Sequence, residues 1–222
     1  VSAGYLISEG EDESERARMI YGYVWSDYDD GAGQLAASIL CDLLCGSNAS
    51  PLKKALLDRT LAKDAVMYSI KNRKQTVVLE IRDLKAEDIP EIEKTVTEVI
   101  DGLISGGIEK SRLHATLNSI EFRLRERDFG SLPLGIAFSM SMIGDWIYGG
   151  NPEDSLLVEE VIKQVRQMIE NGEFEGILSD LMLKNPHRAS VIMLPDNKLG
   201  EENAREERES LNKILSQNTG KA

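Results

Sequence analysis

The sequence predicts an α+β fold in which helices pack on one face of a mostly antiparallel sheet. Period-two patterns typical of strands occur at residues 19–25, 64–82 and 188–194, and helical patterns fill most of the remaining sequence. Because strands do not alternate regularly with helices, a doubly wound parallel sheet is disfavoured. A chain of 222 residues with 41% hydrophobic residues can bury one sizeable core, with room for an appendage.

The elements of the first half follow from alternation and from capping signals. In order, we expect a strand over 19–25, a helix over 31–45, a short helix over 52–57, and strands over 64–71 and 74–82. Asp29 and Asp30 supply caps for the first helix. Ser50, followed by a proline, is a typical start for the second helix.

Three apolar stripes at helical spacing predict helices in the second half. They are Ile89, Ile92, Val96, Val99 and Leu103; Leu113, Leu117, Ile120 and Leu124; and Leu157, Val161, Val165 and Met168. A further short helix is expected over 174–183 and a strand over 188–194, stopping at Pro195. A charged helix over 199–215 closes the chain.

Residues 134–148 are apolar nearly all round the helical circumference. Such a helix is expected to be buried on most sides, with Trp146 in the core. The run is too short to cross a bilayer, so no membrane segment is predicted.

The charge balance argues against several classes of partner. A net charge of −12 disfavours nucleic acid, whose phosphates need concentrated Lys and Arg, and it disfavours an anionic membrane surface. Cys41 and Cys45 lie four apart in an apolar helical pattern, a spacing that does not aim the two sulfurs at each other. Two buried thiols are expected, which is compatible with a cytoplasmic location.

Several motifs suggest chemistry that their surroundings contradict. Residues 31–36 match G-x-G-x-x-A between a strand and a helix, the dinucleotide-binding pattern. However, Asp27, Asp29 and Asp30 precede the glycines, where a pyrophosphate would need positive charge. The same aspartates hint at a calcium loop, but the glycine comes one position early and Ser38 stands where a Glu is required.

The two histidines, His114 and His187, lie far apart in the sequence, whereas a catalytic zinc needs three protein ligands. A structural role is expected for each. The carboxylate runs are read as solvated surface rather than as general acid–base pairs, which need burial. These runs are Glu9, Glu11, Asp12, Glu13 and Glu15, and Glu201, Glu202, Glu206 and Glu207. No catalytic, cofactor-binding or metal-binding residue is therefore assigned.

Three blocks, taken in order, resemble one family. The most specific runs from 118 to 152 and reads N-S-I-E-F-R-L-R-E-R-D-F-G-S-L-P-L-G, then an apolar run, then D-W-I-Y-G-G-N-P. The others are L-L-C-G-S-N-A-S-P-L-K-K-A-L at 43–56 and K-N-P-H-R-A-S-V-I-M-L-P-D at 184–196. Together they resemble the presequence-protease branch of the insulinase/pitrilysin zinc metallopeptidases. That family works through H-x-x-E-H, which this sequence lacks.

The resemblance implies the second, non-catalytic domain of a peptidase with two halves that close around an unfolded peptide. Residues 1–195 would be the inactive domain and 196–222 the start of a charged linker helix. The implied partners are the catalytic zinc domain, the C-terminal half of the same parent chain and the unfolded peptide. Zinc would belong to the parent and not to this fragment. The alternative is a subunit or scaffold domain from a homologue that has lost peptidase activity.

Overall fold

A computed structural model describes residues 1–8, 10–126 and 130–218. Glu9, residues 127–129 of the central block and residues 219–222 of the tail lie outside this description, as does the side chain of Leu124. Within the described residues, one sheet of five strands has the order β1-β5-β2-β4-β3. Its strands are β1 (Ser2–Leu6), β2 (Ala17–Asp27), β3 (Asp64–Ile70), β4 (Lys74–Leu84) and β5 (Arg188–Asp196).

The sheet confirms the mostly antiparallel prediction and adds one strand to it. β2 pairs antiparallel with both β4 and β5, and β3 with β4, so the expected hairpin forms. The sequence did not predict β1, which pairs parallel with β5 at one edge. β5 also continues through Pro195 to Asp196, two residues beyond the predicted end.

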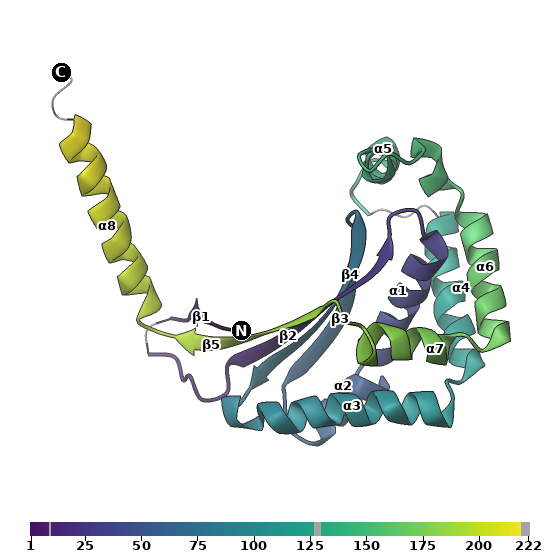
Figure 1. Cartoon of the computed structure of the whole chain (residues 1–222), viewed down its shortest axis with the longest axis horizontal. Helices are drawn as coiled ribbons and strands as arrows, with labels where there is room; N and C mark the ends of the chain where they lie inside the picture. Colours follow the sequence, from purple (N-terminus) through teal and green to yellow (C-terminus); the bar gives the residue numbers. More distant parts are fainter. Residues whose placement is uncertain (9, 127–129, 219–222) are drawn as a thin grey trace.

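Helices cover one face of this curved sheet, as predicted (Figure 1). Their bounds are α1 (Gly31–Cys45), α2 (Pro51–Asp58), α3 (Ile89–Gly106), α4 (Lys110–Glu126), α5 (Leu134–Trp146), α6 (Val158–Asn171), α7 (Phe174–Leu178) and α8 (Leu199–Asn218). Short 3₁₀ turns precede α3 (η1, Ala86–Asp88) and α6 (η2, Pro152–Leu156), and a π-turn, η3 (Ser179–Leu183), follows α7. The opposite face of the sheet is open, with α5 and α8 standing at its two ends (Figure 1).

The core lies between the sheet and these helices. Register places Met19 beside Ile81 and Ile192, and Ala65 beside Ile81, so these side chains point to the same face. β4 buries Val77, Leu79 and Ile81 completely, as the alternation predicted. Burying apolar area of this kind contributes about 25 cal/mol per Å².

Two helices bury a different set of residues from the predicted stripe. α6 buries Ile162, Val165 and Ile169, whereas Leu157 is 58% exposed. Leu157 is the N-cap and lies outside the helix. The buried positions Ile162 and Ile169 each follow a position of the predicted stripe by one residue. In α3, Ile100 is completely buried although the predicted stripe passed over it.

The prediction of a core helix at 134–148 was wrong about its environment. α5 forms, but of its residues only Ala137 and Asp145 are buried. Trp146 is 66% exposed, and the element that packs closely against α5 is η2. Apolar composition all round a helix shows that it needs a covering surface, and the described residues supply little of one.

Candidate functional site

The glycine motif at the start of α1 is a helix cap. The Asp30 carboxylate accepts a hydrogen bond from the Gly33 N–H at 2.9 Å, and the Asp30 carbonyl accepts one from the Gln34 N–H at 3.0 Å. A side chain at position 33 would collide with the Asp30 carboxylate, since a Cβ would lie 2.1 Å from Oδ2. The position that a pyrophosphate would need is therefore taken by a carboxylate.

The aspartates before this helix are engaged in structure. Asp27 forms an ion pair with Lys74 at 3.0 Å, and its carbonyl accepts a hydrogen bond from the Gln34 side chain at 2.7 Å. With Asp30 used as the cap, these carboxylates do not converge on a cation.

The histidines lie on different elements with different neighbours. His114, on α4, contacts Glu170 of α6 through Nε2 at 2.9 Å. The His187 N–H donates to Asn185 Oδ1 at 2.8 Å, and its carbonyl accepts from the Val24 N–H where β5 begins. Among the described residues, no three His, Cys, Asp or Glu side chains gather in a way that fits zinc.

Cys41 and Cys45 are unbridged thiols on the buried side of α1. Burial raises the pKa of each thiol to about 12. The thiol, not the thiolate, therefore predominates at neutral pH, so neither residue is an activated nucleophile.

The described carboxylates of the N-terminal run lie at the surface, and most of them have a bonded partner. The Asp12 carboxylate accepts hydrogen bonds from Ser14, which lower its pKa. Glu15 pairs with Lys63 at 3.0 Å, and this contact lowers the pKa of Glu15. Such exposed pairs do not tune an acid–base catalyst.

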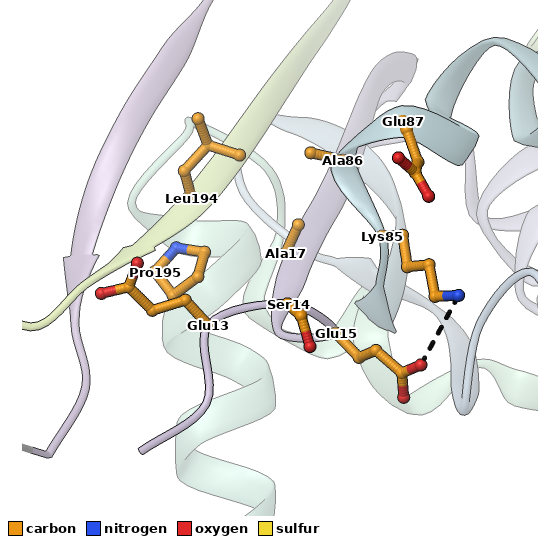
Figure 2. Close-up of a pocket in the computed structure, with 9 residues that line it drawn as sticks. All are labelled: Glu13, Ser14, Glu15, Ala17, Lys85, Ala86, Glu87, Leu194 and Pro195. Atoms are coloured by element: carbon orange, nitrogen blue, oxygen red, sulfur yellow. Dashed lines mark ion pairs between the residues drawn. The ribbon is translucent and has the colours of Figure 1, made fainter. Parts of the chain in front are cut away.

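A hollow of 790 Å³ lies beside this run (Figure 2). Glu13, Glu15 and Glu87 stand around it, and Lys85 pairs with Glu15 at 3.7 Å across one side (Figure 2). Ala17, Leu194 and Pro195 give it apolar walls. A nucleophile with an adjacent base is not among its lining residues, so nucleophilic hydrolysis has no support there.

A charged cluster that the sequence did not lead us to predict lies on the open face of the sheet. Arg82 donates two hydrogen bonds to Glu80, each 2.8 Å, and Arg18 lies 3.9 Å from the same carboxylate. The Arg82 contacts lower the pKa of Glu80. The signal was available, because alternation places residues 80 and 82 on the face opposite Leu79 and Ile81.

A second missed contact holds α5 to the domain. Lys71, in the β3–β4 turn, lies 2.8 Å from the buried Asp145 carboxylate of α5. The Tyr28 and Tyr148 rings are in contact at a tilt of 39°, with centroids 5.9 Å apart. Gly150 packs closely against the Tyr28 ring, and a Cβ added at this position would lie only 3.0 Å from Tyr28 Cε2.

None of the described helices is long and apolar enough to cross a membrane.

Comparisons with known proteins agree on one relationship. Residues 1–120 match the model described as peptidase M16 inactive domain. The chain is 31% identical, over 95% of its length, to Protein HypA of Clostridium perfringens, and 29% identical, over 82%, to Presequence protease 1, chloroplastic/mitochondrial, of Arabidopsis thaliana. It spans 22% and 17% of those two relatives.

Solved structures show the same fold. The inactive peptidase domain from Bordetella parapertussis superposes with a TM-score of 0.66, covering 84% of this chain and 97% of that one at 11% identity. The peptidase M16 inactive domain from Pseudomonas fluorescens gives 0.57 at 15% identity, covering 88% and 43%.

Proposed function

Because this chain belongs to the peptidase M16 inactive domain family, in the presequence-protease branch of the insulinase peptidases, we propose that it is the non-catalytic wall of a zinc endopeptidase. In this proposal the parent degrades unfolded peptides. The zinc and the catalytic base belong to another domain of the same polypeptide. Among the residues that the structure describes, no group of side chains fits zinc, so no chemical step is assigned to them.

The open face of the sheet supports a role in enclosing substrate. It is curved, none of the described helices packs across it, and α5 and α8 frame it (Figure 1). A wall of this kind can position a peptide and exclude water, and both effects lower a reaction barrier without a chemical group. The proposed partners are the zinc domain, the C-terminal half and the unfolded peptide.

The proposed division is an inactive domain over residues 1–195 and a linker from 196 to 222. α8 is exposed over its described side chains from 201 to 216, and it leads away from the body beyond β1 and β5 (Figure 1). An isolated helix of this kind is marginal in water, so it suits a segment that gains support from further chain. Cytoplasmic location remains our proposal, supported by the two buried free thiols.

The family match over residues 1–120, combined with a sequence that lacks H-x-x-E-H, carries the proposal. The test is kcat of the parent on a short peptide. Deleting residues 19–194 should abolish cleavage with every zinc ligand retained, whereas His114→Ala should leave kcat nearly unchanged. A deletion that keeps full activity would show that the domain is not a chamber wall.

A parent that lacks H-x-x-E-H upstream of this domain would favour the alternative, a scaffold that has lost catalysis. The isolated chain, incubated with an unfolded peptide and added zinc, should show no chelator-sensitive cleavage in either case. Cleavage that follows this protein through purification would contradict both.

A further inference from the structure

The helix α5 has an inverted orientation: its charged residue points into the domain and its apolar stripe points out. Ile136, Met140, Ile143 and Ile147 recur at helical spacing and are between 47% and 69% exposed. Asp145 and Ala137, on the opposite side, are buried. Trp146, next to the stripe, widens the exposed apolar surface. Contiguous apolar surface of this kind on a folded domain marks an interaction site.

Specific contacts hold the helix in this orientation. The ion pair between Lys71 and Asp145 fixes its inner side, and the Gly150 N–H donates to the Asp145 carbonyl at 3.1 Å just beyond its end. The contact between the tilted rings of Tyr28 and Tyr148 ties the same end to the β2–α1 loop. These contacts on the inner side of α5 therefore hold the apolar stripe facing outward.

The charges around the stripe define what can cover it. Residues 130–160 contain no Lys or Arg. They carry the exposed Glu153 and Asp154 on η2, which packs against α5, and the exposed Glu159 and Glu160 at the start of α6. Two basic side chains lie nearby, Lys71 paired with Asp145 and Arg125 paired with Glu159, so the acidic groups remain in excess. A complementary partner is apolar at its centre and basic at its rim. A second copy brings the same acidic rim and a net charge of −12, so self-association is opposed by like charge.

We propose that α5 is the docking face for another domain of the same polypeptide, one with an apolar patch rimmed by Lys or Arg. This rests on the proposed function, in which the chain is part of a longer peptidase. The chain spans about a fifth of the length of its relatives, and a parent of similar length would have further domains able to cover the stripe. Tethering gives such a domain a high effective concentration. In Figure 1 α8 lies at the far end of the sheet from α5.

Hydroxyl-radical footprinting read by mass spectrometry tests the proposal without mutation. Met140 and Trp146 are 64% and 66% exposed in the isolated chain and should oxidise fast there. In the full-length parent, without peptide, both rates should fall at least fivefold. The buried Met19 should stay unreactive in both proteins, which reports that each is folded.

Four outcomes would overturn the proposal. Equal oxidation in the isolated chain and the parent, or a reading frame with no further domain, would mean that no tethered domain covers α5. Protection of the isolated chain at 100 μM but not at 1 μM would identify a second copy as the occupant. Protection of the parent that requires added unfolded peptide would identify substrate instead.

A variant pair links the protection to the stripe itself. Met140→Ser with Ile143→Ser in the parent should restore fast oxidation of Trp146. The matched control Tyr68→Ser, at a 42% exposed site on the open face, should leave Trp146 protected. Retained protection in the double variant would contradict docking through α5. Footprinting does not depend on cleavage, so a parent that protects Trp146 but hydrolyses nothing would refute the proposed function and leave this inference standing.

Discussion

The helices α1 and α5 have similarly apolar sequences and opposite environments. α1 buries Ile39, Leu40 and Leu44 completely between the sheet and neighbouring helices, whereas α5 exposes Met140, Trp146 and most of its other large side chains. α1 directly follows β2 and is capped by Asp30, so the chain places it on the sheet at once. α5 follows Pro133, which provides no side-chain cap. It packs mainly against η2, the next element in the chain. Apolar content indicates that a helix will be covered, but not by which part of a protein.

The largest effect that would sharpen this comparison is expected in α1. Leu40→Ala should lower the free energy of unfolding of the isolated chain by about 3 kcal/mol, because it leaves a cavity in a packed core. Ile143→Ala in α5 is the matched control and should cost less than about 1 kcal/mol. Denaturant titration of both variants measures the difference. Equal losses would mean that the two helices share one environment.

The cap of α1 should contribute less than its core contacts. Asp30→Ala removes the acceptor for the Gly33 N–H and should cost about 1 kcal/mol. Asp30→Asn keeps an acceptor at that position and should recover most of the loss. If Asp30→Asn were as unstable as Asp30→Ala, the charge of Asp30 rather than its cap hydrogen bond would hold the helix start.

The anchor of α5 should affect local motion more than global stability. Lys71→Ala leaves the buried Asp145 carboxylate without its ion-pair partner, but local detachment of α5 lets water reach that carboxylate, so global stability should fall by only about 0.5 kcal/mol. Amide hydrogen exchange over residues 134–146 should nevertheless accelerate, because α5 can then detach alone. Lys74→Ala is the control, since its partner Asp27 lies at the end of β2. Unchanged exchange in α5 after Lys71→Ala would show that the contact between Tyr28 and Tyr148 is enough to hold α5 in place.

The smallest effect is expected at Trp146. With two-thirds of its surface exposed, Trp146→Ala should cost less than about 1 kcal/mol in the isolated chain. In the full-length parent the same substitution should cost several times more if α5 is covered there. A loss of about 3 kcal/mol or more in the isolated chain would restore the core position that the sequence suggested.

The sequence predicted the elements whose signals are local. The cap at Asp30, the helix that follows it and the alternation of Val77, Leu79 and Ile81 are all encoded within short windows, and the structure has them. β1 was missed because five residues rich in small side chains carry little pattern, and their partners lie near residue 192. The environment of α5 was missed because apolar composition alone does not say whether a helix is covered by its own domain or left on the surface.

The candidate site could be predicted only as a set of exclusions. The sequence argued against a dinucleotide site because aspartates precede the glycines. In the structure the Asp30 carboxylate caps the helix where a pyrophosphate would bind. Alternation alone places Glu80 and Arg82 on one face, but adding Arg18 to this cluster needed the register between β2 and β4, which a single sequence does not fix. The Lys71–Asp145 pair joins residues from separate elements and has no local signal.

The position of β5 has a consequence for how the domain assembles during synthesis. β5 lies between β1 and β2, so β1 has no place in the sheet until residues 188–196 leave the ribosome. Ser2 of β1 pairs with Ile192 of β5, so β1 must wait for partners that are translated much later. Contacts this distant in sequence slow folding, and a nascent chain that stops short of β5 leaves an edge of β2 unpaired and open to aggregation.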